Sequence, residues 1–185
     1  MLVSTADRSH PESEKSSGEI AVSTTRPHVT SGHAEFASCI EQLPELLDRL
    51  WAAPAVPRRN HDRVPTAPGV YLFSEQGKPM YVGQTRNLYR RLAEHTRPSS
   101  RCNQASFAFL LALSEGEARG GKVVGTRDEV AVHPDFEPAF VEAKARVAAM
   151  EVRFLQLAEP KLRTLFEVFA AMVLGTEKFN DFETH

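Results

Sequence analysis

The stretch GVYLFSEQGKPMYVGQTRNLYRRL, residues 69–92, decides the fold of this chain. It contains two short runs rich in aromatic and β-branched residues, 69–73 and 79–83, with the glycine-containing segment 74–78 between them. Such runs around a short glycine loop are typical of a β-hairpin. The sequence therefore predicts two antiparallel strands joined by a tight connection.

A helix is predicted directly after this hairpin, over residues 87–96, because its first residue is an asparagine that can cap it. Arg91 and His95 are four residues apart, so they share one face of that helix. Tyr71 and Tyr81 come from the two strands. Two tyrosines, an arginine and a histidine gathered within 25 residues suggest a site that cuts phosphodiester bonds.

Composition predicts one domain with a local basic surface. The chain has 185 residues, 42% of them hydrophobic, which is enough for one sizeable core. A net charge of -2 argues against a globally basic nucleic-acid binder, but residues 58–101 hold nine basic and three acidic residues, a local charge of +6. The nucleic-acid contacts that we predict from this segment are Lys78, Arg86, Arg90, Arg97 and Arg101.

Cysteine usage and hydropathy favour a cytoplasmic protein. Cys39 and Cys102 are far apart and lack metal-ligand spacing, so neither a disulfide framework nor a zinc site is predicted. The N-terminus has no apolar targeting run, and eighteen apolar residues never occur together. We therefore expect neither export nor a membrane partner.

The chain is predicted to fall into three parts. Residues 1–33 are polar and rich in Ser, Thr and Pro, which indicates a disordered tail. Residues 34–65 comprise an amphipathic helix, 34–51, and a basic, proline-rich connection. Residues 66–185 form the main domain.

Further elements are predicted in the second half of the domain. They are a helix over 104–113, a long loop over 116–135, a helix over 137–150 and a helix that starts at Pro160 and stops at Gly175. Residues 152–157 fit a third strand or the continuation of the preceding helix. Periodicity does not decide between these two alternatives.

Glu167 is the only ionisable residue between Thr164 and Thr176. The predicted helix around it is apolar on nearly every face, which is typical of a buried helix. A carboxylate is costly there unless it is paired, binds a cation or opens onto a cleft. We therefore expect Glu167 to belong to a functional site.

The hairpin motifs resemble the GIY-YIG nuclease family. Gly69-Val70-Tyr71 is similar to the first family motif and Tyr81-Val82-Gly83 to the second, and Arg91 stands ten residues after the second tyrosine, as in the family. The resemblance covers roughly residues 66–180. It implies an α+β fold with a small antiparallel three-stranded sheet flanked by helices, which an N-terminal helix precedes here.

The same resemblance implies a metal-binding glutamate followed about a dozen residues later by an aromatic residue and an asparagine. Glu167 precedes Phe179-Asn180 by thirteen residues and is also favoured by the burial argument. Glu151 is the alternative, because it lies nine residues before Pro160, as in the simplest members. Choosing Glu167 lengthens the interval from Arg91, as in members with an inserted helix, which include some restriction-type enzymes.

A metal-dependent DNA endonuclease is the function that the resemblance implies. One Mg²⁺ or Mn²⁺ ion on Glu167 would contact the scissile phosphate and stabilise the leaving oxygen. Tyr71 would act as general base for water, and Arg91 would bind the phosphate. Tyr81 would orient the water. Asn180 would fix the geometry of the site, and His95 matches a histidine of homing and restriction members.

One departure from the family pattern supports an alternative. Many members have a lysine directly after the second motif, where this chain has Gln84. Either Arg86 or His95 takes its place, or the domain is an inactive nucleic-acid-binding or adaptor module that retains the fold. No second recognised domain accompanies the first, so a homodimer or a separate targeting protein is the expected partner besides DNA.

Overall fold

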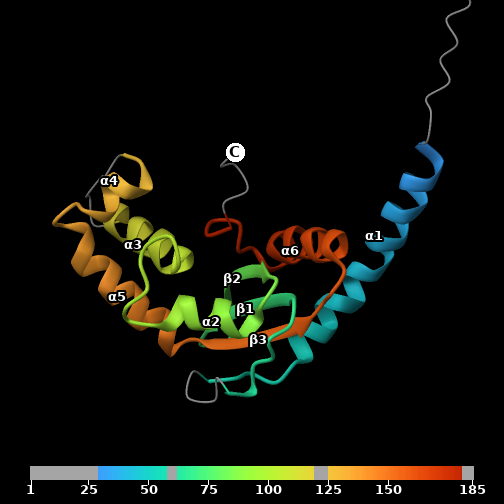
Figure 1. Cartoon of the computed structure of the whole chain (residues 1–185), viewed down its shortest axis with the longest axis horizontal. Helices are drawn as coiled ribbons and strands as arrows, with labels where there is room; N and C mark the ends of the chain where they lie inside the picture. The colour runs from blue at the N-terminus through green and yellow to red at the C-terminus, as the bar shows by residue number, and fades with distance from the viewer. Residues whose placement is uncertain (1–28, 58–61, 119–124, 181–185) are drawn as a thin grey trace, which may run out of the picture.

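The computed structural model describes residues 29–57, 62–118 and 125–180. Its centre is a three-stranded antiparallel sheet in the order β2-β1-β3, with helices on both faces (Figure 1). The strands are β1 (Gly69–Glu75), β2 (Lys78–Thr85) and β3 (Glu151–Gln156). The helices are α1 (Val29–Ala52), α2 (Leu88–Thr96), α3 (Ser106–Ala118), α4 (Arg127–Ala131), α5 (Phe136–Ala149) and α6 (Pro160–Leu174). The predicted α+β fold is confirmed.

The middle strand β1 is buried on both faces, because successive side chains of a strand point to opposite sides. Val70 and Leu72 pack into one core with α1 and α6. Tyr71 and Phe73 pack into a second core with α2, α3 and α5. The sheet therefore separates two hydrophobic layers, and Tyr71 lies in the layer that holds α2.

Gly83 is required by the close approach of a tyrosine to β2. In the β1–β2 ladder it pairs with Tyr71. A Cβ atom at position 83 would overlap the hydroxyl and ring of that tyrosine. The glycine of the second motif thus makes room for the aromatic side chain of the first.

The uncertain segment 152–157 forms a strand. β3 covers Glu151–Gln156 and pairs antiparallel with β1 from Gly69 to Ser74. Val56 forms an isolated bridge to Val152, which ties the connection after α1 to the sheet. Long-range pairing therefore decides a segment for which local periodicity had allowed two structures.

Two predicted boundaries are wrong. The expected loop over 116–135 is partly helical, because α3 continues to Ala118 and the short α4 follows. A capping box in which Thr126 and Glu129 hydrogen-bond each other's backbone explains how so short a helix begins. Helix α1 starts at Val29, inside the predicted tail 1–33. The rest of that tail, 1–28, lies outside the described residues.

Helix α6 differs from the prediction of a helix buried nearly all round. Its ends are as expected, with Pro160 in the first turn and Gly175 in the left-handed conformation at the C-cap. Its outer face, however, exposes Met172 by 63% and Val173 by 57%. The helix covers one face of the sheet and leaves its other side open, so apolar composition alone overstated its burial.

Within the described ranges, no helix is long and apolar enough to cross a membrane.

Candidate active site

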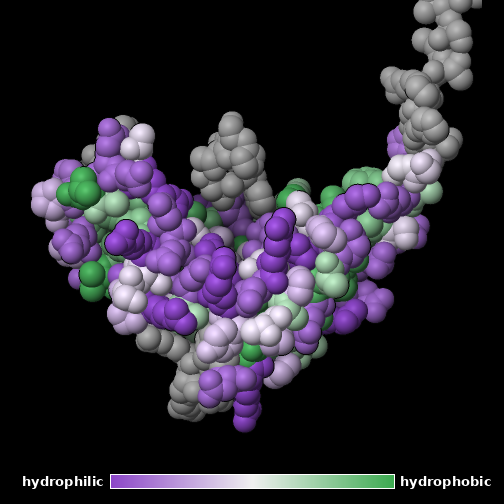
Figure 2. All heavy atoms as spheres, viewed as in Figure 1, coloured by the Kyte–Doolittle hydropathy of each residue, from purple (hydrophilic) through white to green (hydrophobic). Residues whose placement is uncertain are grey.

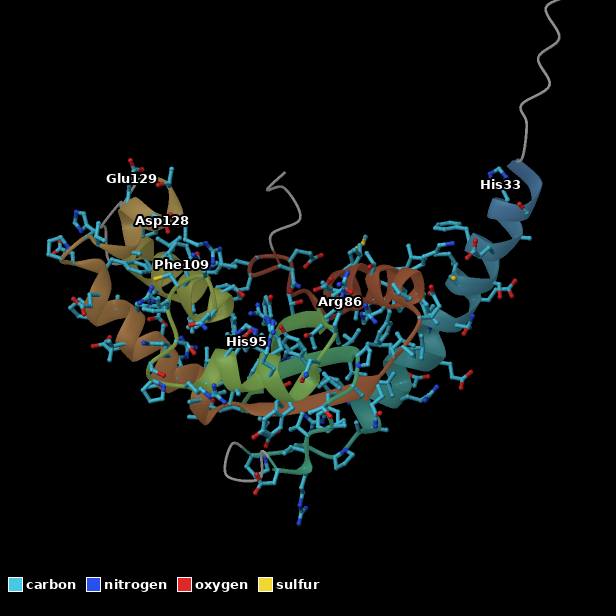
Figure 3. All side chains as sticks on the ribbon, viewed as in Figure 1. His33, Arg86, His95, Phe109, Asp128 and Glu129 are labelled. Atoms are coloured by element: carbon cyan, nitrogen blue, oxygen red, sulfur yellow. The ribbon has the colours of Figure 1, made fainter. Side chains whose placement is uncertain are left out.

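The hairpin and α2 bring Tyr71, Arg91 and His95 together. The side chain of Asn87 caps α2 by accepting from the backbone of Arg90, which fixes the orientation of the helix over the sheet. Tyr71 Oη lies 2.8 Å from His95 Nε2, and Arg91 Nε donates to the same oxygen at 3.3 Å. Figure 3 shows His95 in the middle of the molecule, between α2 and the sheet. One phenolic oxygen therefore receives two nitrogen neighbours from successive turns of α2.

His95 is fully buried. Burial lowers the pKa of His95 well below its ordinary value, and the charge of Arg91 adds to this effect. Nδ1 has no hydrogen-bond partner among the described residues. An unpaired buried N–H is costly, so we assign the proton to Nε2, which then donates to Tyr71.

Arg91 is anchored by the segment that leads into α3. Nη1 donates to the Gln104 carbonyl at 2.8 Å, and Nη2 donates to Ser106 Oγ at 2.7 Å. Glu94, one turn along α2, forms an ion pair with Nη1 at 3.4 Å. The planar guanidinium is thereby held in one orientation, which suits recognition of a phosphate by a fixed fork.

Tyr81 lies beside Tyr71 in the same layer, with the ring centroids 6.2 Å apart. Its ring stacks on Phe107 of α3 at a centroid distance of 4.7 Å. Burial raises the pKa of Tyr81, and Arg91 opposes this rise while the Glu167 charge adds to it. Both tyrosines are thus kept neutral at ordinary pH, and both lie within the electrostatic field of the same arginine and glutamate.

Glu167 is placed next to this cluster by α6. Its Oε1 atom accepts from the backbone N–H of Gln84 at 3.0 Å, directly after Gly83 on β2. Burial raises the pKa of Glu167, and hydrogen bonds from Gln84 and the charges of Arg91 and Arg163 oppose that rise. The charge of Glu167 raises the pKa of Tyr71 as well as that of Tyr81. This carboxylate is therefore close enough to the tyrosines and the arginine for its charge to act on them.

Glu151, the alternative metal ligand, lies elsewhere. It begins β3 opposite Ser74, whereas Tyr71 is three positions earlier on β1 and pairs with Phe154. It is exposed and pairs with Arg153. Of the two glutamates, only Glu167 is brought to the cluster.

Asn180 reaches the site through the backbone of β2. Its Nδ2 donates to the Val82 carbonyl at 2.5 Å, and its Oδ1 accepts from the Val82 N–H at 3.3 Å. Thr176 also donates to Oδ1. The side-chain amide thus pairs with both backbone groups of Val82, as a neighbouring strand would. It thereby holds the turn at residues 176–180 against the second motif.

The basic residues fall into two groups. Arg86, Arg90, Arg97 and Arg101 are exposed around α2 and its ends, although Arg90 pairs with Glu94. Hydrophilic side chains cover this face of the molecule in Figure 2. Lys78 starts β2 opposite Glu75, at the end of the hairpin away from Gln84 and Glu167. The arginines thus lie on α2 or in the segments that flank it, whereas Lys78 lies at the other end of the hairpin.

Sequence reasoning missed the contribution of the α3 segment. Ser106 accepts from Arg91 and also hydrogen-bonds Tyr81, and Phe107 stacks on that tyrosine. Serine and phenylalanine at the start of an apolar helix are ordinary packing residues. Their proximity to the cluster depends on the path of the chain after α2, for which the local sequence contains no signal.

Comparison with known families identifies the domain. The model of the GIY-YIG catalytic domain matches residues 67–162. The chain belongs to the GIY-YIG family. This family consists of nuclease domains, so nucleic acid is the class of substrate. Glu167 and Asn180 lie beyond the matched residues, and their assignment rests on the geometry described above.

The GIY-YIG domain is also similar to two curated relatives, both named UvrABC system protein C. The relative from Deinococcus radiodurans is 35% identical over 60 residues, which cover 30% of this chain and 10% of that protein. The relative from Aquifex aeolicus is 46% identical over 35 residues, which cover 19% of this chain and 6% of that protein. The matched part thus spans a tenth or less of these relatives. No solved structure matches the chain.

The residues of this GIY-YIG domain fit a divalent cation with few protein ligands. The described residues contain no group of three or more His, Cys, Asp or Glu side chains that could hold a metal. Glu167 offers a hard, half-buried carboxylate, and Mg²⁺ is commonly bound by one or two carboxylates together with water and substrate phosphate. A cation would offset the cost of burying that charge.

The burial of His95 predicts a pH-dependent stability. The unfolded chain protonates this histidine below pH ~6.5, whereas the folded domain keeps it neutral. The unfolded state therefore binds more protons, and stability falls as the pH drops below about 6.5, by up to about 1.4 kcal/mol per pH unit. Urea unfolding of wild type and His95→Gln at pH 7.5 and 5.5 measures this term. The stability advantage of wild type should shrink at pH 5.5, and parallel changes in the two proteins would contradict the prediction.

Proposed function

We propose that this GIY-YIG domain is a metal-dependent endonuclease that hydrolyses phosphodiester bonds in DNA. The observation that carries the proposal is the hydrogen-bonded group of Tyr71, Arg91 and His95, beside which Gln84 holds the Glu167 carboxylate within electrostatic reach. Tyr71 as a base for water, Arg91 as a cation that binds phosphate and Glu167 as a metal ligand would thus lie in one place.

Tyr71 is proposed to take the proton from the attacking water. Burial raises the pKa of this phenol well above its ordinary range, and Tyr81 adds to the rise, so the free hydroxyl is a poor base. To act as a base, Tyr71 must first lose its own proton to solvent. The Arg91 guanidinium favours this loss, and Nε2–H of His95 donates to the resulting phenolate, which then takes the proton of the attacking water. The two neighbours therefore supply what a buried tyrosine needs in order to accept a proton.

Arg91 is proposed to bind the scissile phosphate. A guanidinium has five N–H donors, and the contacts to Tyr71, Gln104, Glu94 and Ser106 use four of them. The fifth N–H group can donate to a phosphate oxygen without any change in these contacts. Loss of the contact with Glu94 would free one more N–H donor. A phosphate would thus meet a side chain that is already oriented.

Glu167 is proposed to hold one Mg²⁺ or Mn²⁺ ion. When bound, such an ion neutralises charge on the phosphate and on the leaving oxygen. Tyr81 would orient the water against Tyr71, since the two rings are neighbours. Asn180 would act indirectly, because its amide is engaged with the backbone of β2 between Tyr81 and Gly83.

The test is cleavage of a supercoiled plasmid by the full chain with Mg²⁺, Mn²⁺ or EDTA. We expect nicked product with either metal and none with EDTA. Arg91→Lys keeps the charge but loses the fork, so we expect it to cut about 100-fold more slowly. Linear product would indicate cleavage of both strands, for which a homodimer is the simplest arrangement of a one-site domain.

The same assay tests the alternative of an inactive module, which is motivated by Gln84 at the position where many family members have a lysine. A protein that binds DNA in a salt-dependent manner but cuts with neither metal, and whose binding is unchanged in Glu167→Gln, would be a binding module that retains the fold. RNA of the same sequence, offered in parallel, tests the assignment of DNA as the substrate.

A further inference from the structure

Arg163 is a buried arginine in the first half of α6, with only 5% of its surface exposed. Its Nη1 atom donates to the carbonyls of Leu157 and Ala158, just before the helix begins. Its Nε atom donates to Oε1 of Gln84 at 3.1 Å. The side chain therefore joins the start of α6 to the end of β2.

Among the described residues, the charge of Arg163 is not used in an ion pair. The part of the chain described by the structure offers it no carboxylate within ion-pair distance. A buried guanidinium that meets only neutral acceptors is costly, since buried charges are generally paired. Glu167 lies one helical turn further along the same helix. We therefore expect this buried arginine, which has no ion-pair partner among the described residues, to support the site beside it.

Gln84 connects this arginine to Glu167. Its side-chain oxygen accepts from Arg163, and its side-chain nitrogen donates to Thr164 at 3.1 Å. Its backbone N–H donates to Glu167 Oε1 at 3.0 Å. Both ends of the side chain are held by α6, so the backbone N–H at position 84 is fixed relative to the carboxylate that it contacts.

We propose that Arg163 and Gln84 act as one positioning unit that orients Glu167 for the metal ion. In this unit the Arg163 guanidinium holds the side-chain amide of Gln84, and the backbone N–H of Gln84 contacts the Glu167 carboxylate. The inference rests on the proposed function, because it assigns Glu167 as the metal ligand. Arg163 itself touches neither metal nor substrate in this role.

The experiment measures the Mn²⁺ affinity of the full chain by water-proton relaxation. Groups that hold a metal ligand in place commonly change affinity 10- to 100-fold when they are removed. We expect Arg163→Met and Gln84→Met each to weaken Mn²⁺ binding about tenfold. The double variant should be no weaker than either single variant, because both changes break the same connection. The control variant is Arg153→Met. Arg153 is a half-buried arginine of β3 that pairs with Glu151, so this variant should bind Mn²⁺ as tightly as wild type does.

The combinations of results separate the possibilities. Folded variants with wild-type Mn²⁺ affinity, or single effects that multiply in the double variant, would overturn the proposed unit. If Arg163→Met does not fold, Gln84→Met decides the matter alone, since it leaves the arginine's bonds to the two carbonyls intact. Plasmid cleavage is measured in parallel. A wild-type protein that binds Mn²⁺ and shows the expected losses, but cuts no DNA, would contradict the nuclease proposal and leave the positioning unit standing.

Discussion

Glu167→Gln is expected to lower metal-dependent cleavage by about a thousandfold. Glutamine has nearly the same shape, and its amide oxygen can still accept from the backbone of Gln84. The change therefore removes the negative charge and leaves the local contacts in place. A neutral amide is a much weaker ligand for Mg²⁺ than a carboxylate. The initial rate of plasmid nicking with Mg²⁺ measures the effect.

The matched control for this variant is Glu151→Gln. Glu151 is exposed at the start of β3 and pairs with Arg153, so its loss should change the rate less than about twofold. A larger loss in Glu151→Gln than in Glu167→Gln would transfer the metal site to β3 and overturn the assignment made from the fold.

Stability provides an independent check of the Glu167 variant. Burial raises the pKa of this carboxyl, which means that the folded domain pays a free-energy cost to keep it charged. The melting temperature of Glu167→Gln should therefore be equal to or higher than that of wild type. Loss of cleavage together with a retained or raised melting temperature is typical of a residue that contributes to function while it lowers the stability of the fold.

Tyr71→Phe is expected to reduce cleavage by about 10²- to 10⁴-fold, the usual contribution of a general base. The phenylalanine ring can keep the edge-to-face contact with Phe73, whose centroid lies 5.8 Å away. Only the oxygen that Arg91 and His95 address is lost. We expect kcat to fall while the affinity for DNA stays close to that of wild type, because the exposed arginines are unchanged.

Tyr89 offers the control for the loss of a phenolic oxygen. The chain has three tyrosines, and Tyr89 is the one that lies outside the cluster, 37% exposed on α2. Tyr89→Phe should therefore cut at close to the wild-type rate. Equal losses in Tyr71→Phe and Tyr89→Phe would indicate a general effect on the fold, and an unchanged rate in Tyr71→Phe would exclude this phenol as the base.

Much of the central site could be predicted from local sequence. The hairpin, the cap at Asn87 and the shared face of Arg91 and His95 depend on residues close together in the chain, and the structure contains all three. The 3.6-residue period of a helix and the two-residue period of a strand fix these relations before any long-range contact forms. The hydrogen bonds that Tyr71 accepts from Arg91 and His95 follow from that arrangement.

Other parts depended on contacts between distant segments. Whether 151–156 formed a strand was decided by pairing with β1, about 80 residues earlier in the chain. The exposure of α6 was decided by how much of its surface the sheet and α1 cover. The anchoring of Arg91 by Gln104 and Ser106 required the chain to return over α2 after the turn at 97–105.

The sequence by itself determined the family, the hairpin and the face of α2 that carries Arg91 and His95, because each follows from short-range periodicity and spacing. Only the tertiary structure shows that Glu167, and not Glu151, lies beside the cluster. Both have plausible spacing, but α6 crosses the end of β2 and places Glu167 against the backbone of Gln84, while β3 leaves Glu151 exposed at the other end of the sheet. A carboxylate some 76 residues from Arg91 in sequence is near it in space only through packing, and spacing along the chain carries no information about packing.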